Sequence, residues 1–183
     1  EISTRKLANY PNRFYFSAYK PTDAIIIPRV SSERRQYIPI GYLDADTIVS
    51  DSAHVIYDAP KWLFAVLTSK MHMAWVKTVG GRLKTDYRYS AQLCYNTFPF
   101  LAISELQKAE LEKLAQEVLD IRDEHFDMTL GEMYNPETMP DDLKDVHRRL
   151  DLAVERCYRL EPFTSDEERL ECLFNLYVKM TKK

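Results

Sequence analysis

Glycine is scarce in this sequence, and so are the patterns that small-molecule chemistry requires. The four glycines, at positions 41, 80, 81 and 131, form neither a GxGxxG motif nor a P-loop. The four histidines are scattered and form no HExxH motif. Three cysteines, Cys94, Cys157 and Cys172, make no CxxC pair, which excludes a typical disulfide framework or zinc site. We therefore expect no catalytic residue, no metal site and no cofactor within this chain.

Long apolar runs are also missing. No stretch reaches the roughly 18 residues of a membrane span, and Glu1 to Tyr10 lack the apolar region of a signal peptide. The sequence predicts no membrane partner and a cytoplasmic location, where cysteines stay reduced. Because the chain begins with Glu1 and not with methionine, we expect it to be a piece of a longer protein.

Charge divides the chain into two unlike halves. Residues 1–103 carry 13 Lys and Arg against 8 Asp and Glu, a net charge of +5, whereas residues 104–183 carry 12 against 20, a net charge of −8. The first half is suited to a polyanionic partner, and the second half would be repelled by one. We place a domain boundary here, with residues 1–103 and 104–183 as the two domains.

Strand signals dominate the first half. Prolines separate short β-branched or aromatic runs, which predict strands over residues 13–19, 24–30, 36–42, 47–50 and 54–57. One helix is expected within them, over residues 61–77, because this stretch has no proline or glycine and its apolar residues share a helical face. Gly80 and Gly81 end the helix.

The second half predicts three amphipathic helices. The first follows a capping-box pair, Ser104 and Gln107; the second follows Pro140; the third begins at Ser165, with Glu168 as its capping partner. Short connections between such helices are typical of a small bundle. The expected fold class is α+β: a mixed, mostly antiparallel β-sheet domain with an inserted helix, followed by a small three-helix bundle.

Three charges recur at every second position after the glycine pair. In an extended strand, Lys84, Asp86 and Arg88 would project on one side, with neighbours about 7 Å apart. Lys and Arg donate to guanine in the major groove, and a carboxylate accepts from cytosine, so Lys84 with Asp86 would read one G·C pair. A carboxylate near phosphates is unfavourable, so a row of mixed sign favours base reading over phosphate attraction. The alternative is an exposed strand whose charges pair across neighbours or prevent edge aggregation.

Other polar residues of the first half suit contacts with the phosphate backbone. A donor-rich segment follows the second predicted strand, and further cations lie on and after the inserted helix. The predicted backbone-contacting residues are Arg29, Ser31, Ser32, Arg34, Arg35, Lys70, Lys77 and Arg82. A basic loop that is merely solvated remains the alternative reading of this segment.

An ordered set of segments resembles one family, the MmeI-type enzymes, which are single-chain restriction and modification proteins of bacteria (types IIG and IIL), together with related adenine-specific DNA methyltransferases. The resemblance spans most of the chain and covers both the target recognition domain and the C-terminal region. The segments are IPRVSSERRQYIP at 27–39, SKMHMAW at 69–75, GGRLK at 80–84, YS at 89–90, YNTFP at 95–99, LGEMY at 130–134, MP at 139–140 and LFNLY at 173–177.

The resemblance implies that this chain chooses the DNA sequence. It implies a parent enzyme with an S-adenosylmethionine-dependent domain, and often a nuclease domain, before Glu1. That domain would methylate adenine N6 after flipping the base out of the duplex. The expected partners are double-stranded DNA and this N-terminal methyltransferase domain. In the family, the positions matching Lys84, Asp86 and Arg88 resemble base-reading determinants that vary with specificity.

An alternative hypothesis for the function of this chain is that it is a non-catalytic scaffold that binds other proteins. Its acidic helices would dock partner proteins or the absent domains, and the β half would be structural. The two readings differ in the surface they require. A DNA reader needs Lys84, Arg88 and the segment around Arg34 on one positive, concave face.

Overall fold

Two small antiparallel sheets form the first half of the protein. The computed structural model describes residues 19–182, so the strand expected over residues 13–19 falls, apart from Tyr19, outside them. The first sheet has the order β3-β1-β4, with β1 (Ala24–Pro28) paired to β3 (Gly41–Leu43) and β4 (Ala53–Tyr57). The second has the order β2-β6-β5, from β2 (Val30–Ser31), β6 (Asp86–Arg88) and β5 (Gly81–Leu83).

Local side-chain bonds explain two departures from the predicted strands. The stretch 47–50 forms no strand, because Asp44 Oδ1 accepts from the Thr47 hydroxyl at 2.7 Å and from the Asp46 N–H at 3.2 Å, which closes a turn. The strand expected over 36–42 is extended only from Gly41. Before it, Tyr37 and Ile38 are buried against the core without a strand partner.

The inserted helix is two helices, α2 (Lys61–Leu67) and α3 (Lys70–Val79). The single helix expected over 61–77 is broken at Thr68 and Ser69. Ser69 has extended backbone and caps α3, since its hydroxyl accepts from the His72 N–H. Such a cap favours a new helix start even where no proline or glycine interrupts the sequence. A short π-helix, η1 (Ala91–Tyr95), follows the second sheet.

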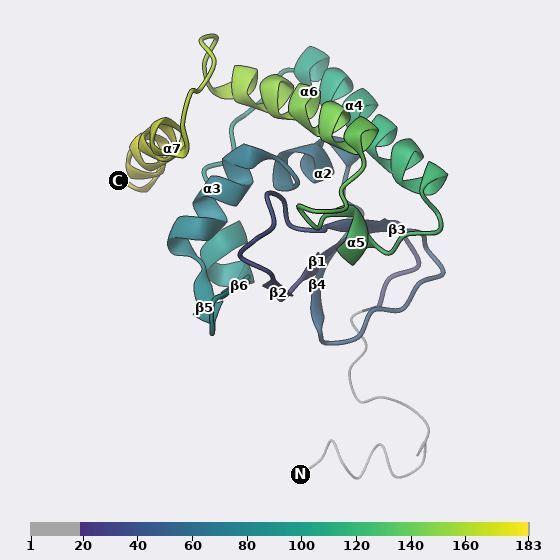
Figure 1. Cartoon of the computed structure of the whole chain (residues 1–183). Coiled ribbons are helices and arrows are strands. Elements are labelled where there is room, and N and C mark those ends of the chain that lie inside the picture. Colours follow the sequence, from purple (N-terminus) through teal and green to yellow (C-terminus); the bar gives the residue numbers. More distant parts are fainter. Residues whose placement is uncertain (1–18, 183) are drawn as a thin grey trace, which may run out of the picture.

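The second half is helical, as expected. Helix α4 (Glu105–Glu124) begins at the predicted capping box of Ser104 and Gln107. It is followed by α5 (Leu130–Met133), α6 (Asp141–Tyr158) and α7 (Asp166–Thr181), whose N-cap is Ser165. Helices α4 and α6 pack on each other and on α2, whereas α7 packs on α3 (Figure 1). The three long helices of the second half therefore share their packing with α2 and α3.

One hydrophobic core joins the two halves. Phe64 and Trp75 of the first half and Leu143 and Leu150 of the second are almost fully buried in the same cluster. The predicted α+β class is confirmed; the boundary near residue 103 stays a prediction, and the core continues across it. Across residues 19–182, none of the helices has both the length and the apolar character that crossing a bilayer would require.

Candidate nucleic-acid interface

The charged row found in the sequence lies on a β-hairpin at the margin of the molecule, beyond the end of α3 (Figure 1). Leu83 pairs with Asp86, so the chain reverses over a two-residue loop, Lys84 and Thr85. Lys84 has a φ of 57°, the sign required at the first position of I′ and II′ hairpin turns. The expectation of one extended strand carrying Lys84, Asp86 and Arg88 is therefore wrong, because Lys84 occupies the turn.

Asp86 and Arg88 nevertheless share one face of β6. Tyr87 between them is buried, and Arg88 is exposed, with no side-chain partner among residues 19–182. Asp86 is partly buried, and its Oδ1 accepts from the Glu33 N–H at 3.4 Å. The hairpin thus presents a cation at its tip, a carboxylate directly after the turn and a second cation two residues further along, at its base.

Arg82 stiffens the hairpin from within. Its guanidinium lies 4.1 Å from the centre of the Tyr87 ring, and Nη1 donates to the carbonyl of Thr85 at 3.0 Å. It also approaches Glu33, at 4.0 Å. Because these contacts occupy the guanidinium, the predicted phosphate-binding residue Arg82 also acts as a support for the turn.

A cleft of about 530 Å³ adjoins the hairpin, with Arg29 and Arg88 in its wall. Tyr89 is fixed beside it from two sides, because its hydroxyl meets His72 Nε2 at 2.9 Å and its carbonyl meets His54 Nε2 at 3.3 Å. Burial lowers the pKa of His72 to about 3, so its imidazole is neutral at pH 7. The cleft therefore combines a cationic rim, from Arg29 and Arg88, with a tyrosine that contacts two histidines.

The π-helix η1 forms another side of this cleft, and it was not expected from the sequence. Its Ala91 carbonyl accepts from the Asn96 N–H at 2.9 Å, a bond that spans five residues. Gln92 and Leu93 are exposed at the cleft. The only sequence signal was Ser90, whose hydroxyl caps the helix by accepting from the Leu93 N–H.

The segment of serines and arginines that ends β2 and begins the following loop contacts the second half through its arginines. Ser31 is buried, and the Ser32 hydroxyl accepts from the Arg34 N–H at 3.4 Å. Arg34 forms an exposed ion pair with Glu137. Arg35 donates from Nη2 to the carbonyl of Gly131 at 3.2 Å.

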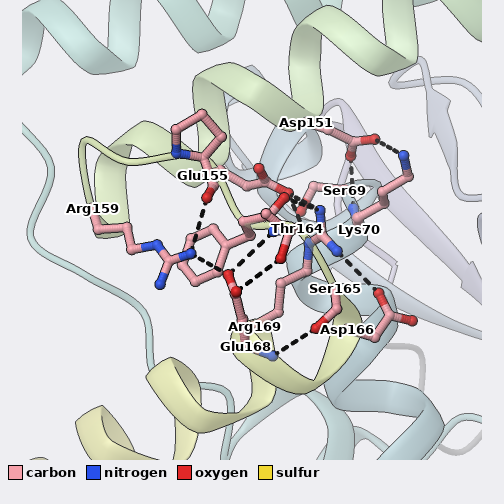
Figure 2. Close-up of polar contacts among 12 residues, drawn as sticks. Ser69, Lys70, Asp151, Glu155, Arg159, Thr164, Ser165, Asp166, Glu168 and Arg169 are labelled. Atoms are coloured by element: carbon pink, nitrogen blue, oxygen red, sulfur yellow. Dashed lines mark hydrogen bonds and ion pairs between the residues drawn. The ribbon is translucent and has the colours of Figure 1, made fainter.

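Lys70 and Lys77 also have partners in the second half. Asp151 of α6 accepts from the Lys70 N–H at 2.7 Å and lies 3.5 Å from its ammonium, while Lys77 pairs with Asp166 of α7 at 3.0 Å. Figure 2 shows Asp151 beside Lys70, and Asp166 beside Arg169 at the start of α7. The structure thus gathers Arg29, Arg82 and Arg88 around the hairpin. It places the other predicted backbone cations at the junction of the halves.

A second cavity, which we call the crease, lies at this junction. It has a volume of about 310 Å³ and is bordered by the loop after β2, the end of α3, strand β6 and the segment between α5 and α6. Its charged lining residues are Glu33, Arg34, Arg35, Lys77 and Lys144. Lys144 is the one cation here that the second half provides, and sequence reasoning missed it because the half as a whole is acidic.

Four buried polar side chains also lie at the junction of the halves: Tyr37, Tyr134, His147 and Asp151. The Tyr37 hydroxyl donates to Asp151 at 2.7 Å, and burial raises the pKa of both side chains, that of Asp151 to about 6. His147 stacks on Tyr37 and meets the Tyr134 hydroxyl at 2.6 Å. Burial holds the pKa of His147 well below its ordinary value, so it is a neutral core histidine. These groups join the halves and do not face the cleft.

No group of three or more His, Cys, Asp or Glu side chains within residues 19–182 is arranged to hold a metal ion.

Comparison with known proteins assigns the family. Residues 1–102 match the family described as MmeI, target recognition domain, and residues 103–183 match MmeI, C-terminal domain. DNA methyltransferase A of Bacillus subtilis (strain 168) is 53% identical over 180 residues, which are 98% of this chain and 20% of that protein.

A solved structure is similar throughout the chain. It is that of the type IIL restriction-modification enzyme MmeI in complex with DNA, which is 39% identical and has a TM-score of 0.89, over 99% of this chain and 24% of the MmeI chain. The present chain thus corresponds to a quarter or less of the length of either protein. Because the two family matches together cover all of it, the chain belongs to the MmeI family, as a target recognition domain followed by a C-terminal domain.

Proposed function

We propose that this chain is the sequence-reading module of a bacterial DNA methyltransferase of the restriction-modification type, and that the β5–β6 hairpin reads base edges in the major groove. The main observation in support of this proposal is the hairpin itself. It is exposed and displays Lys84, Asp86 and Arg88 beside a cleft that has a cationic rim. A two-stranded ribbon fits the major groove. The likeness to an enzyme solved with DNA supports the same partner.

Within this proposal, the residues divide into two roles. Lys84 donates to guanine and Asp86 accepts from cytosine, so that together they read a G·C pair, while Arg88 reads a neighbouring position. Arg29 and Arg82 lie next to them and contact the phosphate backbone. Each bidentate base contact contributes about 1 to 3 kcal/mol of discrimination.

The chemistry belongs to the remainder of the parent protein. We propose that S-adenosylmethionine binds there, that the reaction is methylation of adenine N6, and that this catalytic domain is the protein partner of the present chain. The B. subtilis relative, of which this chain spans 20%, is described as a DNA methyltransferase, which supports a division of labour between recognition and catalysis. Such an enzyme works in the bacterial cytoplasm.

A charge exchange in the full-length enzyme tests the base-reading role. Lys84→Asp combined with Asp86→Lys keeps the composition and reverses the order of donor and acceptor. Sequencing of methylated sites in a random DNA library should show a changed base at one position of the recognition sequence. An unchanged recognition sequence, with activity retained, would overturn the assignment. The matched control is the exchange of Lys108 and Glu105, an exposed pair on α4 at 2.7 Å.

Protein docking is the second candidate, favoured by the −8 charge of residues 104–183. Exposed apolar residues on α7, Phe174, Val178 and Met180, add a surface suited to protein contact. If docking were the whole function, wild-type chain would not retain any DNA in a gel-shift assay at low salt. DNA binding whose affinity falls steeply with salt concentration would instead support the function in DNA recognition.

A further inference from the structure

The crease and the cleft lie on opposite faces of strand β6. Side chains alternate along a strand, and Tyr87 borders the crease while Arg88 borders the cleft. Cations therefore flank the proposed reading hairpin on both sides, Arg29 and Arg88 on one and the crease residues on the other. A ribbon inserted in the major groove also has one phosphate strand on each side, since the groove is about 12 Å wide.

The cations of the crease converge from three separate parts of the chain. Arg34 and Arg35 come from the loop after β2, Lys77 from the end of α3, and Lys144 from the first turn of α6. Glu33 is the only carboxylate among the lining residues. Convergence from such distant segments means that the fold, and not one basic run of sequence, assembles this positive lining.

Exposed ion pairs hold three of these cations in place. Arg34 pairs with Glu137, Lys77 with Asp166 at 3.0 Å, and Lys144 with Asp141 at 2.9 Å. None of these three carboxylates lines the cavity itself. Because exposed pairs contribute only about 0 to 1 kcal/mol, a phosphate that enters the crease can compete for the cations at little cost.

Arg35 has a donor that the fold leaves unused. Its Nη2 donates to the Gly131 carbonyl, but its Nε is buried and has no hydrogen-bond partner within residues 19–182. A buried N–H without an acceptor costs about 1 to 3 kcal/mol. Arg35 is one of the residues that line the crease, and a phosphate oxyanion is the acceptor that a guanidinium favours.

We propose that the crease is a binding site for a phosphate ester, and that in the DNA-bound protein it holds one backbone phosphate of the strand that borders the hairpin on this side. The inference rests on the proposed function for the source of the phosphate. It adds that Lys144, from the acidic half, contacts DNA. The second half thereby helps to set the position of the hairpin in the groove.

The salt dependence of DNA binding tests the contribution of Lys144. Lys144→Gln should make the negative slope of log K against log salt shallower by about 0.9, the value for one phosphate contact on B-DNA. Lys108→Gln is the matched control, because Lys108 likewise pairs with a carboxylate three residues earlier in the first turn of its helix. That control should leave the slope unchanged. If wild type binds DNA and Lys144→Gln has the wild-type slope, the phosphate site is disproved while DNA binding stands.

Titration with inorganic phosphate separates this inference from the proposed function. At constant ionic strength, replacing chloride by phosphate should shift the NMR signal of the Arg35 Nε–H in a saturable way. If wild type fails to bind DNA but Arg35 responds, the crease is a site for a free phosphate ester and the DNA-reading proposal fails. If neither DNA binding nor the Arg35 response is observed, both proposals are overturned.

Discussion

The hydroxyl of Tyr37 donates a 2.7 Å hydrogen bond to Oδ2 of Asp151, across 114 residues of sequence. Asp151 also accepts from the backbone N–H of Lys70, so one buried carboxylate joins the loop after β2, the start of α3 and the middle of α6. A carboxylate in this position sets how the two halves sit against each other. The loop that carries Arg34 and Arg35 is thereby held at the crease.

Removal of the Tyr37 hydroxyl should destabilise the protein. Tyr37→Phe leaves Asp151 buried with one donor fewer, and we expect a loss of about 1 to 3 kcal/mol in the free energy of unfolding, measured by urea denaturation. Tyr57→Phe is the control, since Tyr57 is partly buried and its hydroxyl has no hydrogen-bond partner within residues 19–182. Equal stability of the two variants would show that the buried bond contributes nothing.

Stability should fall as the pH drops below neutrality. The pKa of His72 is about 3 in the folded protein, against an ordinary value of 6.5, so its contribution is present above 6.5 and is lost as the pH falls toward 3. His147 acts in the same direction. Asp151, with a raised pKa of about 6, acts in the opposite direction: its contribution is present below 3.8 and is lost as the pH rises through 6.

The two buried histidines destabilise the folded protein as the pH falls, and their combined effect is larger than the opposing effect of the single Asp151 carboxyl. The free energy of unfolding should therefore decrease between pH 6.5 and pH 4. Urea denaturation at several pH values measures this decrease. Asp151→Asn should make the decrease steeper in that range, because it removes the opposing contribution. An NMR titration in which His72 gains its proton near pH 6.5 in the folded protein would contradict the prediction.

At position 84, the tip of the hairpin, glycine should be tolerated better than any residue that has a side chain. Lys84 has a φ of 57°, so Lys84→Gly relieves backbone strain and should leave stability unchanged or raise it by about 1 kcal/mol. The same change removes the proposed guanine donor and should reduce discrimination at one base position. Thr85→Gly is the matched control, because Thr85 is the other loop residue and lacks a positive φ. It should lower stability in a thermal melt.

Release of Arg34 from its partner should strengthen DNA binding. Glu137→Gln removes the competing carboxylate, and binding should rise for all sequences alike, whereas Arg34→Ala should lower it for all sequences alike. Fluorescence anisotropy with a cognate and an unrelated duplex measures both effects. A change in sequence preference in either variant would contradict a role limited to the phosphate backbone.

Much of the secondary structure could be predicted because its signals are local. The capping box of Ser104 and Gln107 starts α4 where the sequence placed it, and the isoleucines of β1 form a central strand. The break at Ser69 was missed, since an N-cap within an apolar run resembles a continuous helix. The hairpin was missed for a similar reason: its loop contains Lys84 and Thr85 in place of the usual glycine or asparagine.

The sequence by itself determined the α+β class, the charge division between the halves, the family, and the residues that the hairpin displays. These depend on composition, periodicity and short motifs, which do not need three-dimensional proximity. Only the tertiary structure decided that Lys84 lies in a turn, that Arg34, Arg35, Lys70 and Lys77 meet partners in the second half, and that Lys144 joins them. Such contacts depend on how distant segments pack on one core. Packing between residues far apart in the sequence leaves no local pattern in the sequence.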